Sequence, residues 1–254
     1  MIPPALALAA AIAIGFCIGS FLNVVIARLP EGKNIVFPRS ACPRCGHLIV
    51  WYDNIPIVSW LVLRGRCRSC GGPISWRYPV VEALSAGLFA LALLRFGVGP
   101  ALIVGLLFLS ALLVITAIDL DHQIIPDEIT VPGIAVGFLA NLVTGGVPWL
   151  DSLLGIVVGG GVFFVIILLS RGGMGGGDMK LGAMMGAFLG WRLGILAVFL
   201  GVLSGGLVAV ILLALGRKGR KDAVPFGPFL ALGGAASLLW GESILAWYLA
   251  RFAG

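Results

Sequence analysis

Long apolar runs recur along this chain and limit it to one class of fold. A helix needs about 20 apolar residues to cross the hydrocarbon core of a bilayer, and such runs follow one another through the sequence. Hydrophobic residues fill 60% of the 254 positions and charged residues only 11%, whereas a soluble domain carries about 25% charged residues. The runs do not alternate apolar and polar residues as the strands of a membrane barrel do. We therefore predict an all-α, polytopic membrane helical bundle.

The runs predict about eight transmembrane helices. They cover residues 4–28, 79–96, 100–118, 128–146, 149–170, 178–191, 193–215 and 225–250. The first run lacks a basic n-region and is too long for the h-region of a signal peptide, so we expect a retained helix. The fourteen residues of 178–191 reach only about 21 Å, so this helix either thins the bilayer or lies among its neighbours. Its small residues, spaced from Gly182 to Gly190, suit close helix packing.

The basic residues indicate how the helices are oriented. Of the 17 Lys and Arg residues, fourteen lie on one side of the predicted bundle, in the loop 29–78 with its flanking Arg28, the turn 171–180 and the loop 216–222. The positive-inside rule places these loops in the cytoplasm and both termini outside. Aromatic residues are not interleaved with the basic ones, so we expect no nucleic-acid partner. The chain then divides into a first helix (1–28), a cytoplasmic loop domain (29–78) and a helical bundle (79–254).

Two C-x-x-C turns give the loop domain its framework. Cys42, Cys45, Cys67 and Cys70 form the pairs, and each pair is followed by Gly, which lets the backbone turn at the sulfurs. Four thiolates at this spacing predict a closed, structural Zn²⁺ site, with disulfides as the alternative for a loop outside the cytoplasm. About fifty residues cannot bury a large core, so a metal would hold the loop together. The fifth cysteine, Cys17, is expected to be a small buried residue of the first helix.

Acidic residues follow the third apolar run, in the sequence I-D-L-D-H-Q-I-I-P-D-E. Asp119 and Asp121 are two positions apart and so about 200° apart on a helix, which prevents both from facing one partner. Asp119 lies closer to the apolar run and is expected to point into the bundle, with Asp121 and His122 at the surface. Asp127 is expected to cap the start of the next helix.

A glycine-rich turn, R-G-G-M-G-G-G-D-M-K-L (171–181), joins two later apolar runs. Asp178 and Lys180 lie at its inner end, at or near membrane depth, where an ionisable group is a functional candidate. A flexible turn with snorkelling charges is the alternative. Lys180 either snorkels in this way or holds a carboxylate of the substrate.

The two acidic regions together predict a carboxylate pair. If Asp119 and Asp178 meet about 3 Å apart, both cannot ionise, so one acts as general base on a water and the other as general acid. Such a pair can hydrolyse a peptide bond without a Ser, Cys or catalytic metal. A proton-coupled transporter with a zinc-stabilised loop is the alternative, because its relay also needs acids that face a cavity.

The loop domain also contains the aromatic and polar segment W-Y-D-N-I-P, residues 51–56. Trp51 and Trp60 flank Asp53 and Asn54, so the segment can line a small-molecule pocket. It can equally form the small core of the domain or an interfacial aromatic belt.

Several of these motifs, taken in order, resemble a known family. Y-P-V-V-E (Tyr78–Glu82) follows the four-cysteine loop, and I-D-L-D-H-Q-I-I-P-D and G-M-G-G-G-D-M-K-L come later. This pattern is similar to the bacterial type IV prepilin peptidases that combine leader peptidase and N-methyltransferase activities, and the resemblance covers nearly the whole chain.

The resemblance implies a function for each motif. Asp119 and Asp178 match the catalytic aspartates, and the cysteines match the zinc-bearing loop. The family cleaves leaders from prepilins and type II secretion pseudopilins at the inner membrane and then methylates the new N-terminus with S-adenosylmethionine. Gly177, Lys180 and Glu82 become candidates for substrate binding. Asp53 and Asn54 become candidates for the methyltransferase site, because the methyl donor is polar and this loop is the only sizeable one.

Overall fold

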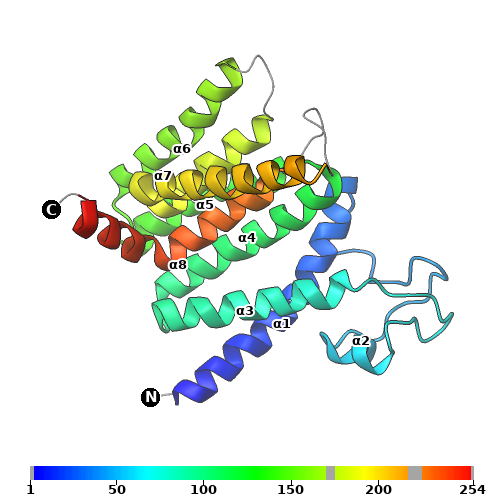
Figure 1. Ribbon diagram of the computed structural model, residues 1–254. Coiled ribbons are helices and arrows are strands. Elements are labelled where there is room, and N and C mark those ends of the chain that lie inside the picture. The colour runs from blue at the N-terminus through cyan, green and yellow to red at the C-terminus, as the bar shows by residue number, and fades with distance from the viewer. Residues whose placement is uncertain (1–2, 170–174, 217–224, 253–254) are drawn as a thin grey trace. The chain divides into compact units, whose positions relative to one another are not determined.

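The computed structural model describes residues 3–169, 175–216 and 225–252, and these residues form helices joined by turns and loops, with no extended strand among them (Figure 1). Six of the described helices are long and apolar enough to cross a membrane. This confirms the predicted all-α membrane fold. The eight predicted segments reappear as seven long helices, one of which is bent into two parts. The number of membrane crossings, about eight, stays a prediction.

The chain forms two compact units, residues 1–102 and 103–254. In the first unit, α1 (Pro4–Arg28) packs against α3 (Arg77–Phe96), and the polar loop between them holds η1 (Leu29–Glu31), η2 (Trp51–Asp53) and the short α2 (Val58–Val62). The two long helices approach closely because a Cβ at Gly15 would lie 2.6 Å from the Cα of Ala86, and one at Gly19 would lie 2.7 Å from the Cα of Glu82. This is the contact that small residues spaced four apart allow between membrane helices.

Cys17 lies on the same helix, between these two glycines, and is exposed. The prediction of a buried cysteine is therefore wrong. The face of α1 that packs on α3 is set by Gly15 and Gly19, and a residue two positions from either one points to another side of the helix.

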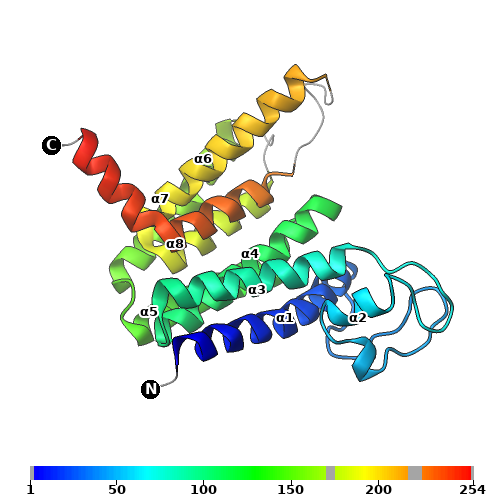
Figure 2. The ribbon, with the colours of Figure 1, turned by 60° about the horizontal axis from the view of Figure 1, so that its bottom comes forward.

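In the second unit, α4 (Pro100–His122), α5 (Asp127–Thr144), α6 (Trp149–Leu169) and α8 (Gly227–Phe252) accompany the long α7 (Gly176–Ala214), as Figures 1 and 2 show. Residues 181–190 of α7 are all buried. Of the two alternatives for this short predicted helix, the structure confirms that it lies among its neighbours. Its glycines do pack closely, since a Cβ at Gly186 would lie 1.9 Å from the carbonyl oxygen of Gly155 in α6.

The helix α7 bends sharply at Gly190, whose φ of 74° and ψ of 173° are not helical. Beyond the bend the chain folds back, so that a Cβ at Gly194 would lie 3.3 Å from the Cα of Gly186. In a continuous helix these residues would be about 12 Å apart. The bend leaves carbonyl groups before it without helical amide partners. Side chains take the place of the missing amide donors. Asn141 Nδ2 donates to the carbonyls of Ala187 at 2.9 Å and Phe188 at 3.1 Å. Ser152 Oγ also donates to the carbonyl of Ala187, at 2.7 Å.

Candidate functional site

Asp119 lies in the last turn of α4 and points into the second unit, with 5% of its surface exposed. Its Oδ2 accepts a hydrogen bond of 2.8 Å from the backbone N–H of Gly227, the first residue of α8. The first N–H groups of a helix have no partner within the helix, so this amide is free to donate. Asp121 and His122 are exposed. The predicted orientations of these three side chains are confirmed.

Asp178 lies in the first turn of α7, and 9% of its surface is exposed. Its backbone N–H donates to the carbonyl of Gly175 at 3.2 Å, which fixes the start of the helix. The carboxylates of Asp119 and Asp178 are close enough to interact electrostatically. Two acidic side chains 59 positions apart in the sequence are thus brought to one buried location by α4 and α7. Of the glycine-rich turn before Asp178, residues 171–174 lie outside the described part of the chain.

Two residues near this pair have other partners than predicted. Helix α5 begins at Asp127 with Pro126 as its N-cap and without a side-chain cap, so the predicted capping role of Asp127 is wrong. Its carboxylate instead pairs with Lys180, at 2.5 Å between Oδ2 and Nζ. Lys180, predicted either to snorkel or to hold a carboxylate of the substrate, is thus paired with a carboxylate of the chain itself. Gly177 packs against Ile125, whose Cβ would lie 2.8 Å from a Cβ at position 177.

The four cysteines of the loop come together. Their Sγ atoms all lie within 4.8 Å of one another, and those of Cys42 and Cys70 are 3.9 Å apart. Tetrahedral Zn²⁺ with Zn–S bonds of about 2.3 Å separates its sulfurs by about 3.8 Å, so the residues fit the ion. The two turns are built alike. Each ends at a glycine with positive φ, 69° at Gly46 and 68° at Gly71, whose N–H donates to the carbonyl of the first cysteine at 2.9 Å.

The electrostatics at Cys42 also suit a metal ligand. Hydrogen bonds from the backbone N–H groups of Cys45 and Arg44 lower the pKa of the Cys42 thiol to about 6. A thiolate, not a thiol, binds a metal. The turn geometry that the sequence indicated therefore favours the ligand form of this cysteine.

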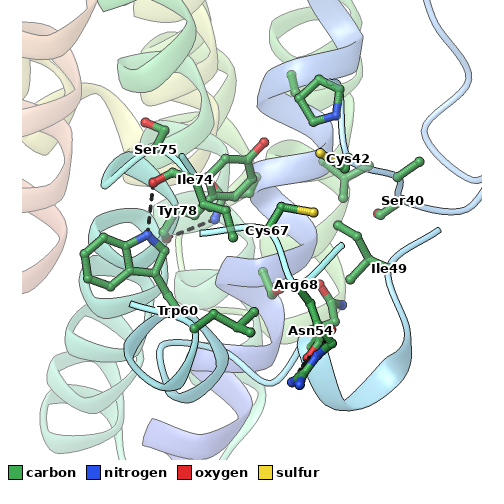
Figure 3. A pocket seen from close by; sticks show the side chains of 18 of the residues that line it. Ser40, Cys42, Ile49, Asn54, Trp60, Cys67, Arg68, Ile74, Ser75 and Tyr78 are labelled. Atoms are coloured by element: carbon green, nitrogen blue, oxygen red, sulfur yellow. Dashed lines mark hydrogen bonds and ion pairs between the residues drawn. The ribbon is translucent and has the colours of Figure 1, made fainter. Parts of the chain in front are cut away.

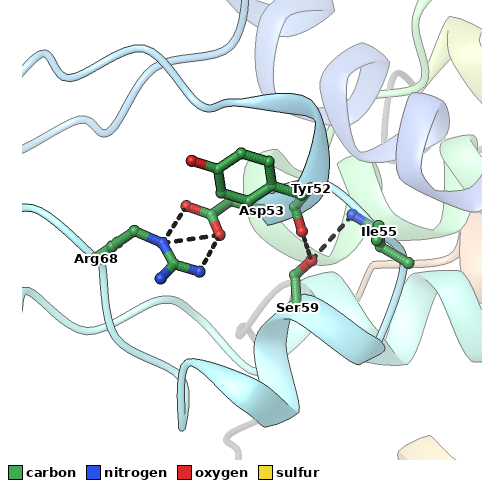
Figure 4. Close-up of polar contacts among 5 residues, drawn as sticks. All are labelled: Tyr52, Asp53, Ile55, Ser59 and Arg68. Carbon is green, nitrogen blue, oxygen red and sulfur yellow. Dashed lines mark hydrogen bonds and ion pairs between the residues drawn. The ribbon is translucent and has the colours of Figure 1, made fainter.

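The segment W-Y-D-N-I-P folds as η2 and the turn that leads into α2. Arg68 donates to both carboxylate oxygens of Asp53 at 2.6–3.0 Å, and Figure 4 shows this pair beside the hydroxyl of Ser59. Ser59 Oγ donates to the carbonyl of Tyr52 at 2.8 Å and accepts from the N–H of Ile55 at 3.0 Å. The hydrogen bonds from Arg68 lower the pKa of Asp53, so this side chain is a charged structural partner within the loop.

A cavity of about 480 Å³ lies in the first unit, between the loop, α1 and α3. Figure 3 shows Trp60 and Tyr78 on one side of it and Ile49 and Asn54 on another. Asn54 and Trp60 line it as the pocket interpretation predicts, whereas Trp51 does not line it and is 76% exposed. A pocket of this volume falls within the range of small-molecule sites.

Glu82 of α3 also lines this cavity and has 6% of its surface exposed. Its Oε2 accepts a hydrogen bond of 2.7 Å from the N–H of Ile57, and the Ser20 hydroxyl is its second partner. Asn23, in α1, lines the cavity as well and donates to the carbonyl of Tyr78 at 3.1 Å. Sequence reasoning overlooked Ser20 and Asn23, although a buried amide within an apolar membrane run was a signal.

Comparisons with known proteins agree with this arrangement. Residues 13–96 match the bacterial peptidase A24 N-terminal domain, and residues 106–210 match the type IV leader peptidase family. A protein of Aeromonas hydrophila named prepilin leader peptidase/N-methyltransferase is 40% identical over 92% of this chain and 91% of its own length. The chain belongs to the type IV leader peptidase family.

Further relatives carry the same name. One of Pseudomonas aeruginosa is 39% identical over 96% of this chain and 93% of its own length. One of Myxococcus xanthus is 46% identical over 82% of this chain, but the match spans only 64% of the length of that relative. No solved structure gives a significant match. The two family matches together contain both acidic regions and all four cysteines of the loop, and they do not favour the transporter alternative.

Proposed function

We propose that this chain is an aspartic endopeptidase of the inner membrane that removes the leader peptides of type IV prepilins and type II secretion pseudopilins, and that it then N-methylates the new N-terminal residue. The observation that carries the proposal is that Asp119 and Asp178 are both buried and interact electrostatically in a member of the type IV leader peptidase family. The names of the relatives supply the substrate class and the second activity.

Cleavage follows from the chemistry of two neighbouring carboxylates. One is ionised and takes a proton from a water as the water attacks the carbonyl carbon of the scissile bond. The other is protonated, donates a hydrogen bond to the carbonyl oxygen, and then gives its proton to the leaving amine. The Gly227 amide fixes the orientation of the Asp119 carboxylate in this scheme. Burial excludes bulk water and strengthens each of these polar interactions.

Gly177 and Lys180 would act on the substrate from the start of α7, two positions or fewer from Asp178. For Lys180 this role requires that the substrate replace Asp127 as its partner. Gly177 also has a structural role, because it packs against Ile125 and a side chain at position 177 would not fit there.

Methyl transfer is assigned to the first unit. Zn²⁺ held by Cys42, Cys45, Cys67 and Cys70 would hold together a loop with little core of its own. S-adenosylmethionine supplies an electrophilic methyl group, and the amine freed by cleavage accepts it. Asn54 offers an amide to the cavity, and Asp53 contributes by holding Arg68 in place. The loop 29–78 and the acidic pair are assigned to the cytoplasmic face and both termini to the periplasm, because fourteen of the 17 basic residues lie in this loop with its flanking Arg28, the turn 171–180 and the loop 216–222.

The test is the mass of a prepilin co-expressed with the chain. The wild type should give a pilin that lacks its leader and carries one added methyl group. Asp119→Asn and Asp178→Asn should each give uncut, unmethylated pilin from a folded enzyme, because the amine does not exist before cleavage. Asp121→Asn, at an exposed position, is the matched control and should cleave normally. Cleavage by Asp119→Asn with loss of cleavage by Asp121→Asn would contradict the proposed pair.

A further inference from the structure

Glu82 is a buried carboxylate at a cavity, and its partners carry no positive charge. The N–H of Ile57 and the hydroxyl of Ser20 are both neutral. Three arginines line the same cavity: Arg28, which donates to the backbone carbonyls of Asn34 and Pro38, Arg68, which donates to Asp53, and Arg44. A buried charge is costly unless it is paired. A ligand with a positive group near Glu82 would supply the charge partner that this carboxylate lacks, and the arginines of the same cavity suit a ligand that also carries a carboxylate.

The backbone next to Glu82 is strained. Ile57 has a φ of 58°, a conformation that is unfavourable for a β-branched residue. Its N–H makes the 2.7 Å hydrogen bond to Oε2 of Glu82, and it directly precedes α2. Strain of this kind persists where the surrounding structure holds it, and it clusters at ligand sites. The residue that directly follows the W-Y-D-N-I-P segment thus contacts the last residue of Y-P-V-V-E.

The rest of the cavity suits a ligand with an aromatic part. Trp60 is held by a hydrogen bond of 3.2 Å from its Nε1 to the carbonyl of Ile74, so its ring is fixed at the cavity wall. Ile49, Leu63 and Ile74 add apolar surface. A flat heterocycle can pack on this wall while a positive group lies at Glu82.

We propose that this cavity is the methyl-donor site and that Glu82 binds the cationic end of S-adenosylmethionine. The site rests on the proposed methyltransferase activity and gives its location. In the transfer, the lone pair of the neutral pilin amine forms the new N–C bond as the S–CH₃ bond breaks. The sulfur keeps the bonding electrons and becomes a neutral thioether, and the methylated amine releases a proton to water. The sulfonium charge thus disappears during the reaction, whereas the ammonium of the amino-acid group remains, so Glu82 would favour the donor over the product only if it contacts the sulfonium.

Binding measurements on the full-length protein in detergent test this site directly. The probes are S-adenosylmethionine and S-adenosylhomocysteine, which share the adenosine and amino-acid groups but differ in the charge on sulfur. Glu82→Gln, of nearly the same shape, should weaken binding of S-adenosylmethionine about tenfold to a hundredfold, the range for a hydrogen bond to a charged group. Glu82→Asp, which keeps the charge, should lose less. Glu242→Gln, an exposed acid of α8, is the control and should bind normally.

If Glu82→Gln loses more affinity for S-adenosylmethionine than for S-adenosylhomocysteine, the sulfonium lies at Glu82. If it loses affinity for both equally, the ammonium lies there. Both results support the site. Zinc content and thermal melting of Glu82→Gln show whether the loop remains folded. A folded Glu82→Gln that binds both probes as the wild type does would overturn the site. The site would also be overturned if Glu82→Gln bound the donor normally but had a raised Michaelis constant for pilin, because Glu82 would then bind the acceptor amine. A wild type that cleaves pilin but binds neither probe would instead refute the proposed methyl transfer.

Discussion

Replacing Gly227 by Ala tests whether the start of α8 positions Asp119. The added Cβ would lie 2.8 Å from Oδ2 of Asp119 and 3.1 Å from its Cγ. Real Cβ atoms essentially never approach other heavy atoms closer than 3.0 Å. The carboxylate must therefore move away, and it cannot keep its 2.8 Å hydrogen bond to the Gly227 N–H.

The expected loss comes from that hydrogen bond and from the displacement. A hydrogen bond to a charged group contributes about 1.5–3 kcal/mol, which corresponds to about a tenfold to hundredfold change in rate. A shift of about 1 Å in a reacting group costs about a hundredfold by itself. The lost hydrogen bond and the displaced carboxylate result from the same movement, so their effects on the rate are not multiplied. We expect kcat for leader cleavage to fall about a hundredfold, with a smaller change in the Michaelis constant.

The assay is cleavage of purified prepilin in detergent, with thermal melting of each variant. Gly206→Ala is the matched control, because Gly206 is an exposed helical residue and a Cβ there would meet no heavy atom within 4 Å. It should cleave at the wild-type rate. A Gly227→Ala enzyme that melts and cleaves like the wild type would refute the positioning role. A loss of activity matched by an equal loss of the folded fraction would refute it too, because the effect would then be on folding.

Three further predictions concern the other polar contacts. Cys42→Ser should lower the zinc content from about one per chain and lower the melting temperature, whereas Cys17→Ser should retain the metal; two disulfides and no zinc would contradict the site. Lys180→Met and Asp127→Asn should each lower the free energy of unfolding by less than about 1 kcal/mol, because the ion pair is partly exposed. The double variant should lose no more stability than either single variant, because both substitutions remove the same interaction. A raised Michaelis constant in Lys180→Met alone would instead indicate that Lys180 binds the substrate. Asn54→Ala should give pilin that is cleaved but unmethylated, as read from its mass, and full methylation would move the transferase site elsewhere.

The sequence was sufficient for the features that depend on local pattern. Apolar runs located the membrane helices because crossing the bilayer needs a fixed length of apolar chain. Helical geometry separated buried Asp119 from exposed Asp121, which lie only two positions apart. The C-x-x-C-G spacing indicated both turns of the cysteine cluster, since the glycines adopt the positive φ that the turns require.

The features that sequence reasoning missed depend on contacts between distant segments. Asp127 looked like a helix cap because it follows Pro126, but its partner, Lys180, lies 53 positions away. The partner of Asp119, Gly227, lies 108 positions away and acts through its backbone, which no residue type reveals. The bend at Gly190 was foreseen only as a boundary between two helices. That its free carbonyls are satisfied by Asn141 and Ser152 follows from packing of α5 and α6.

The two sites solve the same physical problem in the same way. Asp119 and Glu82 are both buried carboxylates in membrane-length helices, and each accepts a hydrogen bond from a backbone N–H, of Gly227 and Ile57 respectively. A Lys or Arg partner would neutralise the carboxylate and occupy the space that a substrate needs. A backbone amide satisfies one oxygen, adds no net charge and cannot move away as a long side chain can. The carboxylate is thereby held in place while its charge stays available to a proton or a cationic ligand. A Gly without Cβ at one site and a strained Ile at the other are what bring these amides within reach.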